Sequence, residues 1–257
     1  MMRHRNVVII TLILIGAWCL TAGGLITSGV QAQTDSLNRG IITLTFDDGW
    51  KSQYVNALPE MRRYGFKGTF YIYTSVIGTD SERMTVSNLR ALRAYGNEIG
   101  SHTVTHPDLT QISDAQLVTE LSQSKTSLEA WLGTGTVKNF ACPSDGYNTH
   151  TTSYVDNYYR SQRTVDVGWN TKGNFLPYLI RTQNIDQTTT PQQVGAWVNQ
   201  AKADKYWLVL VYHQVTNSPD LYDVSVRNFK NGLSKIKASG VPVLTIDKAL
   251  DEVMPQI

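Results

Sequence analysis

Cysteine is scarce in this chain of 257 residues, which contains only two. Cys19 lies in an apolar segment near the N-terminus, and the other cysteine is Cys142. If the N-terminal segment is removed, Cys142 has no partner for an internal disulfide. The sequence therefore excludes a disulfide-stabilised scaffold, and any argument for export has to come from the N-terminus itself.

An excess of one charge sign is also absent. The chain has 23 basic and 21 acidic residues, and Arg3 and Arg5 belong to the N-terminal segment. Without these two arginines the charges balance, so no basic stripe is left to attract a polyanion over a distance. We therefore expect no nucleic-acid partner.

Long hydrophobic runs are confined to the N-terminus. Arg3 and Arg5 precede an apolar run from Val7 to Leu20, and the segment ends in the small-residue pattern Val30-Gln31-Ala32. This order is typical of an export signal that is cleaved after Ala32. A retained membrane anchor is the alternative, although polar and small residues dilute the run.

The rest of the chain is long enough for one well-buried core. We expect a signal peptide (or N-terminal anchor) over residues 1–32, a short linker over 33–40 and a single catalytic domain over 41–257. Once the signal is cleaved, we expect a monomer with no membrane attachment. Its predicted location is extracytoplasmic, either secreted or associated with the cell envelope.

Apolar runs typical of β-strands alternate with helical patterns after residue 40. The runs are Ile41–Phe46, Gly68–Tyr73, Glu98–Ser101, Val137–Cys142, Thr164–Val167, Leu179–Ile185, Trp207–Tyr212 and Val241–Ile246. This alternation predicts parallel strands with helices outside, in either a (β/α) barrel or an open doubly wound sheet. The stretch Asn184–Pro191, rich in glutamine and threonine, is interpreted as a surface loop.

Polar residues follow several of these runs, where catalytic groups gather in such folds. Asp47 and Asp48 follow the first run, His102 and His106 the third, and His213 the seventh. The backbone turns at the end of a strand, so two adjacent carboxylates can face one site there. One of them could hold a metal while the other moves protons.

The spacing of His102 and His106 allows two imidazoles to reach one cation. Asp48 would complete a site of two histidines and one carboxylate, with open positions for water and substrate. Such a site suits a divalent metal, with Zn²⁺ preferred and Co²⁺, Ni²⁺ or Mn²⁺ as alternatives. Taken alone, the histidine pair can be a surface coincidence and His213 a packed core residue; the combination favours a metal centre.

Three motifs in order resemble those of the polysaccharide deacetylases, the NodB-homology domains of carbohydrate esterase family 4. They are TFDDG at 45–49, SHTVTHP at 101–107 and LVLVYH at 208–213. The resemblance covers roughly residues 41–250. It implies an α/β fold of the deformed (β/α) barrel type with a single catalytic domain. It also implies a hydrolase in which a metal-activated water removes acetyl groups from a glycan.

The resemblance assigns roles to the five polar residues that follow the strands. It implies that Asp48, His102 and His106 bind the metal. Asp47 would act as the general base that takes the proton of the attacking water, and His213 as the general acid that protonates the departing amine.

A further motif of the family is altered here. Many members have an arginine that orients the base, followed by a proline and an aromatic residue, whereas this chain reads FACPSDGY at 140–147. By resemblance, the backbone N–H of Ser144 would stabilise the oxyanion. The arginine is missing, and we nominate Arg181 as the substitute partner of Asp47. A role for Arg181 in a surface salt bridge is the alternative.

Other candidates for the site have weaker support. Asp166, in a loose version of the family's acid and tryptophan motif, could orient His213 or simply cap a loop. Trp50, Trp169 and Tyr147 are candidates for stacking on sugar rings, although tryptophans more often pack in cores.

Three hypotheses about function follow. The first is a secreted metal-dependent enzyme that removes N-acetyl groups from peptidoglycan, chitin or poly-N-acetylglucosamine. The second is an O-acetyl esterase acting on xylan or another glycan. The third is a sugar-binding protein that has kept the fold and lost turnover. The complete set of five polar residues favours an enzyme, but the loops that select the glycan cannot be interpreted from composition.

Overall fold

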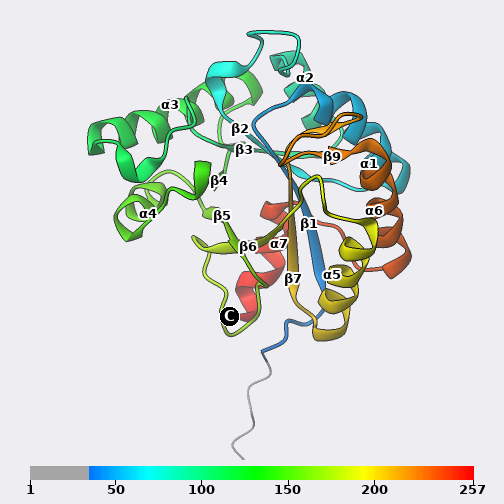
Figure 1. Ribbon diagram of the computed structural model, residues 1–257. Helices are drawn as coiled ribbons and strands as arrows, with labels where there is room; N and C mark the ends of the chain where they lie inside the picture. Colours follow the sequence, from blue (N-terminus) through cyan, green and yellow to red (C-terminus); the bar gives the residue numbers. More distant parts are fainter. Residues whose placement is uncertain (1–34) are drawn as a thin grey trace, which may run out of the picture. The chain divides into compact units, whose positions relative to one another are not determined.

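The computed structural model describes residues 35–257, so the predicted signal and the start of the predicted linker lie outside the described residues. Within 35–257, seven parallel strands close into a barrel in the order β1 to β7 (Figure 1). The strands are β1 (Ile41–Asp47), β2 (Thr69–Ile72), β3 (Glu98–Ser101), β4 (Asn139–Ala141), β5 (Ser161–Val167), β6 (Ile180–Asn184) and β7 (Trp207–Tyr212). The predicted (β/α) barrel is confirmed, and β3 pairs with β4 through a single residue pair.

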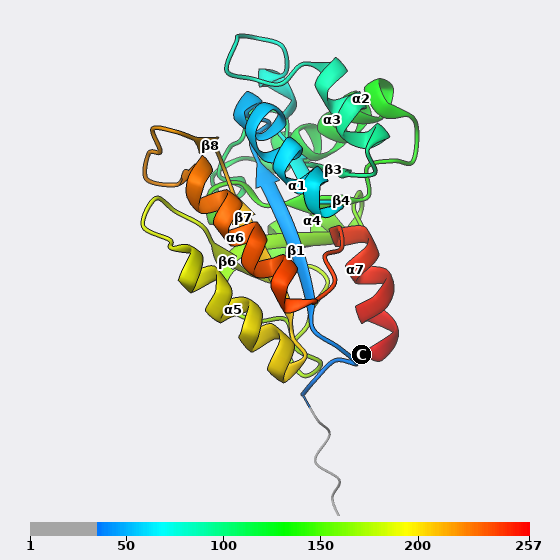
Figure 2. The same ribbon diagram turned by 90° about the vertical axis from the view of Figure 1, so that its right-hand side faces the viewer.

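Helices cover the outside of the barrel and one of its ends. They are α1 (Leu58–Tyr64), α2 (Val86–Ala94), α3 (Asp114–Leu132), α4 (Thr149–Asp156), α5 (Pro191–Asp204), α6 (Val226–Ser239) and α7 (Ile246–Val253). Shorter elements are η1 (Gln53–Ala57), η2 (Thr74–Val76), η3 (Leu109–Gln111), η4 (Pro143–Asp145), η5 (Met254–Gln256) and the pair β8 (Val215–Thr216) and β9 (Val224–Ser225). Figure 2 shows α1, α6 and α5 side by side along β1 and β7. No helix of this described part is both long and apolar enough to cross a membrane.

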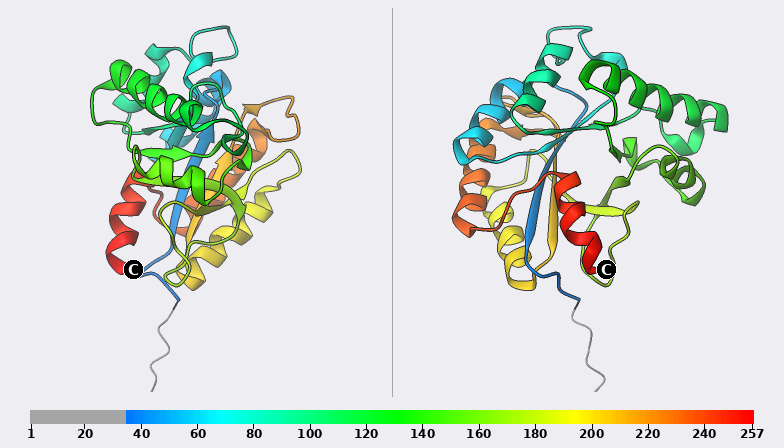
Figure 3. Two further views of the ribbon diagram at one scale, coloured as in Figure 1. Left: turned by 90° about the vertical axis from the view of Figure 1, so that its left-hand side faces the viewer. Right: turned by 180° about the vertical axis from the view of Figure 1, so that it is seen from behind.

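Alternation along β1 sorts its side chains between the outside and the inside of the barrel, and the inner apolar side chains fill one end. Ile42, Leu44 and Phe46 pack outward against the helices, whereas Ile41 belongs to the cluster inside the barrel. That inner cluster includes Trp207 and four residues of α7, which covers the barrel at the ends where β1 and β7 begin (Figure 3). Because this end is filled by apolar side chains, the opposite end, where the strands finish, is the one left for a site.

Local sequence explains where two of the helices begin and end. α3 begins after Ser113, whose side chain accepts a hydrogen bond from the backbone N–H of Gln116. The Gln116 side-chain oxygen accepts one from the backbone N–H of Ser113. α6 begins after Ser225 and ends at Gly240, whose φ of 71° suits glycine.

One predicted strand is wrong. Residues Val241–Ile246 form only an isolated bridge, between Val243 and Ile42, before the chain enters α7. β1 pairs with β7 along almost its whole length but with β2 only from Thr45 onward, so this segment fills the short gap that remains beside the start of β1. This apolar run therefore packs beside the start of β1 and does not form an eighth strand.

Candidate active site

The end of β1 delivers both aspartates to the same side. Asp47 continues the row of inward-facing residues and is only 2% exposed. Asp48 then takes a φ of 75° and Gly49 a φ of 71°. A positive φ is uncommon for a residue with a side chain, and it reverses the chain here so that Asp48 does not point to the outside of the barrel.

Asp48 lies between the two histidines of the loop after β3. Its Oδ1 is 3.6 Å from Nε2 of His102 and 3.5 Å from Nε2 of His106. This buried oxygen has no hydrogen-bond partner among residues 35–257, and one donor atom from each of the three side chains lies within 4.8 Å of the others. Three unpaired donor atoms that converge in this way form a candidate metal centre.

The protonation of His102 fits a metal ligand. Its Nδ1 lies 2.8 Å from the backbone oxygen of Ala141, so Nδ1 carries the proton and donates it. Burial lowers the pKa of His102 to about 4, which keeps the imidazole neutral at pH 7. The Nε2 lone pair therefore faces Asp48, in the arrangement that orients histidine ligands in metal sites. The residues present fit a divalent ion such as Zn²⁺.

A buried carboxylate that the sequence did not single out holds the histidine loop in place. Glu120 of α3 accepts hydrogen bonds from the backbone N–H groups of Val104 (2.7 Å) and Thr105 (2.9 Å). The same loop contains two positive φ angles, 71° at Thr103 and 64° at His106. A β-branched residue in this region is strained, so we infer that Glu120 helps to hold the loop in a conformation it would not otherwise favour.

Trp50 supports Asp48, and one face of its indole is covered. Its indole Nε1 donates a hydrogen bond to Asp48 Oδ2 at 3.1 Å. The guanidinium of Arg83 covers the indole, 3.3 Å from the ring centroid, and donates a hydrogen bond to the Asp48 backbone oxygen. Trp50 therefore orients the carboxylate with Oδ1 turned toward the histidines, and its predicted stacking on a sugar stays a prediction.

Replacing Trp50 by phenylalanine should weaken metal binding by roughly tenfold, the lower end of the range for lost supporting hydrogen bonds. The phenyl ring keeps the surface on which Arg83 lies but removes the N–H donor to Asp48. Competition with a chromogenic chelator measures the dissociation constant directly. Trp169→Phe is the matched control because Trp169 does not contact the site; equal affinity in both variants would contradict the assignment.

The partner of Asp47 is Arg163, not Arg181. Arg163 is completely buried inside the barrel, and its Nη2 donates to Oδ2 of Asp47. It is in register with Ala141 and Ile180, both members of the inner cluster. The sequence interpretation started this strand at Thr164 and so missed Arg163, although an arginine within a buried strand was a usable signal.

The environment of Asp47 keeps it ionised. Burial by itself raises the pKa of this carboxyl, but Arg163 and, when they are protonated, His102 and His213 lower it more, and the net pKa lies below the usual value. Arg163 engages only Oδ2, whereas Oδ1 is buried and has no partner among the described residues. Asp47 thus has one oxygen that is held and one that is free to accept a proton.

Arg181 and Asp166 face away from the site. Arg181 follows the inward-facing Ile180 on β6, so alternation turns it outward, where its side chain lies against Gly168. Asp166 accepts a 2.5 Å hydrogen bond from the hydroxyl of Tyr147 and does not bond to His213. The predicted supporting roles of Arg181 and Asp166 are therefore wrong in this structure, and Tyr147 serves to hold Asp166.

His213 is placed by its backbone. Gln53, fully buried in η1, donates hydrogen bonds from its amide to the backbone oxygens of Asp47 (2.5 Å) and His213 (3.0 Å). One side chain therefore ties the ends of β1 and β7 together. Nδ1 of His213 is buried and unpaired within the described part of the chain, and the ring lies 5.8 Å from that of Tyr222, which is 65% exposed.

These side chains surround a cavity of about 550 Å³, which we call the catalytic cavity. Its lining includes Asp47, Asp48, His102, His106, His213, Ser144, Asp145, Asn184, Asp186 and Tyr222. Ser144 lines it in a left-handed conformation, with φ at 52°. The structure thus brings together all five predicted polar residues and Ser144, and adds Tyr222, which nothing in the sequence pattern had indicated.

Trp169 lies at the other end of the barrel. Its ring is 6.0 Å from that of Tyr206, which precedes β7, and its neighbour Asn170 bonds to the backbone of Trp207. His213 follows the opposite end of the same strand. The predicted stacking of Trp169 on a sugar in the catalytic cavity is therefore wrong.

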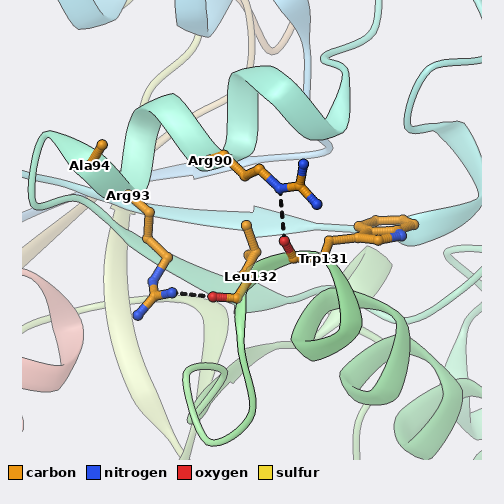
Figure 4. Close-up of a pocket in the computed structure, with 5 residues that line it drawn as sticks. All are labelled: Arg90, Arg93, Ala94, Trp131 and Leu132. Atoms are coloured by element: carbon orange, nitrogen blue, oxygen red, sulfur yellow. Dashed lines mark hydrogen bonds between the residues drawn. The ribbon is translucent and has the colours of Figure 1, made fainter.

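A separate surface hollow of about 440 Å³ lies between α2 and α3 (Figure 4). Arg90 donates a hydrogen bond to the backbone oxygen of Trp131 at 3.0 Å, and Arg93 donates to that of Leu132. The last backbone carbonyls of a helix lack N–H partners within the helix, and a cationic side chain can donate hydrogen bonds to them. This hollow shares no lining residue with the catalytic cavity, and its arginines join the two helices.

Comparison with known proteins points to one family. The family model described as "Polysaccharide deacetylase" matches residues 34–160. A bifunctional xylanase/deacetylase of Pseudobutyrivibrio xylanivorans is 27% identical over 178 residues, which are 68% of this chain and 26% of that protein. A peptidoglycan-N-acetylglucosamine deacetylase of Bacillus cereus is 32% identical over 96 residues, which are 37% of this chain and 43% of that protein. The chain thus matches less than half the length of these relatives.

The fold has solved counterparts. The Xyl-CE4 domain of a multidomain xylanase from the hindgut metagenome of Trinervitermes trinervoides superimposes with a TM-score of 0.60. The alignment covers 83% of this chain and 91% of that domain at 24% identity, which speaks for the fold alone. With the closed barrel, the three motifs and the match of the family model, the chain belongs to the polysaccharide deacetylase family.

Proposed function

We propose that this chain is a metal-dependent hydrolase that removes N-acetyl groups from a glycan outside the cytoplasm. The observation that carries the proposal is the convergence of Asp48, His102 and His106 in one cavity with an ionised Asp47 and with His213. The relative from Bacillus cereus, described as acting on peptidoglycan N-acetylglucosamine, supports an N-acetylated substrate. Chitin and poly-N-acetylglucosamine carry the same acetamido group.

The protein groups have complementary roles in this reaction. Asp47, held by Arg163 at Oδ2, accepts the proton of the attacking water at its free Oδ1. The C–N bond of the acetamide then breaks, and His213 gives its proton to the departing nitrogen. The products are acetate and a free amino sugar. The two groups therefore need opposite protonation states, and the charge of Arg163 favours the ionised form of Asp47.

A metal held by Asp48, His102 and His106 would polarise the acetyl carbonyl and lower the pKa of water. We assign the backbone N–H of Ser144 to the carbonyl oxygen, where negative charge develops. Support for this assignment is that the left-handed turn at Ser144 lines the catalytic cavity. Zn²⁺ is the preferred ion because two imidazoles and one carboxylate with open positions suit it.

O-deacetylation of xylan is a second candidate function. A relative that matches 68% of this chain is a bifunctional xylanase/deacetylase, and a solved domain with the same fold comes from a xylanase. The same base, acid and metal centre would serve an ester, because hydrolysis of an ester and of an amide passes through similar tetrahedral geometry.

Acetate release from chitin oligosaccharides, peptidoglycan, poly-N-acetylglucosamine and acetylated xylan tests both functions. We expect release from an N-acetylated glycan, a fall to background with a chelator, and recovery when Zn²⁺ is restored. Release from xylan alone would select the esterase. Glycan binding by the metal-loaded chain without acetate release from any substrate would overturn both and favour an inactive sugar-binding protein.

A further inference from the structure

The charges of the surface helices are distributed unevenly around the barrel. On α1, α2, α5 and α6 every exposed charged residue is a cation: Arg62, Arg63, Arg90, Arg93, Lys202, Arg227, Lys230, Lys235 and Lys237. The acids of these four helices are Glu60, which is only 8% exposed, and the half-buried Asp204.

The other three helices have the opposite balance. The cations of α3, α4 and α7 are Lys125 and Lys248, whereas their acids are Asp114, Glu120, Glu129, Asp156, Asp247, Asp251 and Glu252. Composition counts charges but does not place them. The even balance that predicted no basic stripe therefore separates into two regions of opposite sign on the folded chain.

The four cationic helices lie next to one another, so their cations form one surface. α6 packs against α5 on one side and against α1 on the other (Figure 2). Lys230 of α6 pairs with Glu60 of α1 at 3.2 Å. Arg62 of α1 covers the ring of Tyr95, the C-cap residue of α2, at 3.8 Å from the ring centroid. We call the outer surface of α1, α2, α5 and α6 the basic flank, and α6 lies at its centre.

Most cations of the basic flank are available to a partner. Within residues 35–257, only Arg63 and Lys230 of this set pair with a carboxylate, and both use Glu60. α6 contains no acid, and its apolar side packs into the barrel through Phe229, Leu233 and Ile236. Because the barrel already occupies the apolar side, the basic flank attracts a partner through its charge, and that partner has to be anionic.

Two observations favour a lipid bilayer as the anionic partner. The described chain begins at the edge of the basic flank, where the backbone N–H of Leu37 donates to the oxygen of Lys205, the C-cap residue of α5. The sequence before this point contains the apolar run Val7–Leu20, the part of the chain suited to a bilayer. The second observation is Tyr95, which is 37% exposed under the guanidinium of Arg62. A tyrosine beside a cation is typical of residues at the headgroup level of a membrane.

We propose that the basic flank docks the domain on the surface of a bilayer rich in anionic phospholipids. The attraction acts over about 10 Å at 0.1 M salt, so cations on the helices beside α6 contribute without touching a headgroup. α5 and α6 run along β7 and β1 (Figure 2). A bilayer against them lies alongside the barrel and leaves the catalytic cavity, at the ends of the strands, open.

This docking does not depend on the proposed function, since no residue of the basic flank lines the catalytic cavity. It replaces the expectation that the chain has no membrane attachment after cleavage, which was based on the N-terminal segment alone. The attachment is peripheral and electrostatic, so it is sensitive to salt and to the charge of the lipid.

Sedimentation with lipid vesicles tests the proposal. The full-length chain would be mixed with vesicles of phosphatidylcholine and with vesicles of equal parts phosphatidylcholine and phosphatidylglycerol. The neutral vesicles record whatever binding the N-terminal apolar run contributes. We expect the partition coefficient to be at least about tenfold higher for the anionic vesicles at about 0.1 M salt, and the difference to vanish at about 1 M salt.

The triple variant Arg227→Gln/Lys235→Gln/Lys237→Gln removes three exposed cations from α6 without breaking an ion pair of the described residues. It should bind the anionic vesicles at least about tenfold more weakly than the parent, with unchanged binding to neutral vesicles. Thermal unfolding shows whether the variant is folded, because exposed polar substitutions on a helix should leave stability nearly unchanged.

Arg39→Gln/Lys138→Gln/Lys248→Gln is the matched control. It removes the same net charge from exposed residues that pair with acids of α7, outside the basic flank. It should keep most of the binding to anionic vesicles. Equal partition of the parent into neutral and anionic vesicles would overturn the proposal, as would equal losses in the two triple variants.

Soluble polyphosphate provides the comparison with a linear polyanion. At the same concentration of phosphate groups it should bind the full-length chain more weakly than the anionic vesicles do, because the cations are spread over four helices and do not form a single row. Tighter binding of polyphosphate that the α6 variant loses would overturn the bilayer as the partner and assign the basic flank to a polymer.

Discussion

Replacing Asp47 by asparagine should lower kcat for acetate release by roughly 10²–10⁴-fold, the range for loss of a general base. The asparagine side chain cannot accept the proton of water, yet its oxygen can still accept a hydrogen bond from Arg163. We therefore expect the variant to fold and to keep its metal. Steady-state kinetics measure the loss, and metal content shows that the ligand set is intact. Thermal unfolding should record a loss of stability, because the buried Arg163 cation no longer faces a carboxylate.

Asp48→Asn provides the contrasting variant, one position along the chain. It removes the anionic ligand between His102 and His106, so its metal affinity should fall together with its activity. Asp47→Asn should instead lose activity and keep its metal affinity. If Asp47→Asn retained activity within a factor of a few, or if it lost metal as readily as Asp48→Asn, the division of roles between the two aspartates would be wrong.

The convergence of the candidate metal ligands was predictable because its members are specified locally. His102 and His106 lie four residues apart in one loop, and Asp48 directly follows a strand that the sequence shows as an apolar run. Such features do not depend on how distant parts of the chain pack. The sequence could not show the two positive φ angles in the histidine loop or its anchoring by Glu120, since these depend on the docking of α3.

The partner of Asp47 was not predictable in the same way. Arg163 lies 116 residues further along the chain, and its contact depends on the register of β5 against β4 and β6. A shift by one residue would turn Arg163 outward, which is what alternation does to Arg181 on β6. Strand register therefore decides whether Arg163 or Arg181 reaches Asp47, and a sequence motif contains no information about register.

Loop residues were the least predictable part of the site. Trp169 follows a strand that ends near the catalytic cavity, but the loop returns to the start of β7 and carries the indole with it. Tyr222 does the reverse: it lies in the segment between β8 and β9 and reaches the ring of His213. Composition does not fix the path of such segments, so residues that stack on a sugar cannot be chosen without knowing that path.

Replacing Arg163 by methionine should lower the free energy of unfolding by about 3–5 kcal/mol, the cost of removing one partner of a buried ion pair. Asp47 would remain inside the barrel, only 2% exposed and without its cation. Burial then raises the pKa of Asp47, because the charge that lowered it is gone. Activity should fall with stability, since a protonated Asp47 cannot act as a base. Urea unfolding of the metal-free protein measures the loss without a contribution from metal binding.

The double variant Arg163→Met/Asp47→Asn distinguishes a specific ion pair from general damage to the core. Neither partner then leaves an unpaired buried charge, so the combined loss should be clearly smaller than the sum of the two single losses. Arg181→Met is the matched control, because Arg181 faces outward on the neighbouring strand and should change stability by less than about 1 kcal/mol. Additive losses, or equal losses for Arg163→Met and Arg181→Met, would show that Arg163 fills space and does not hold Asp47.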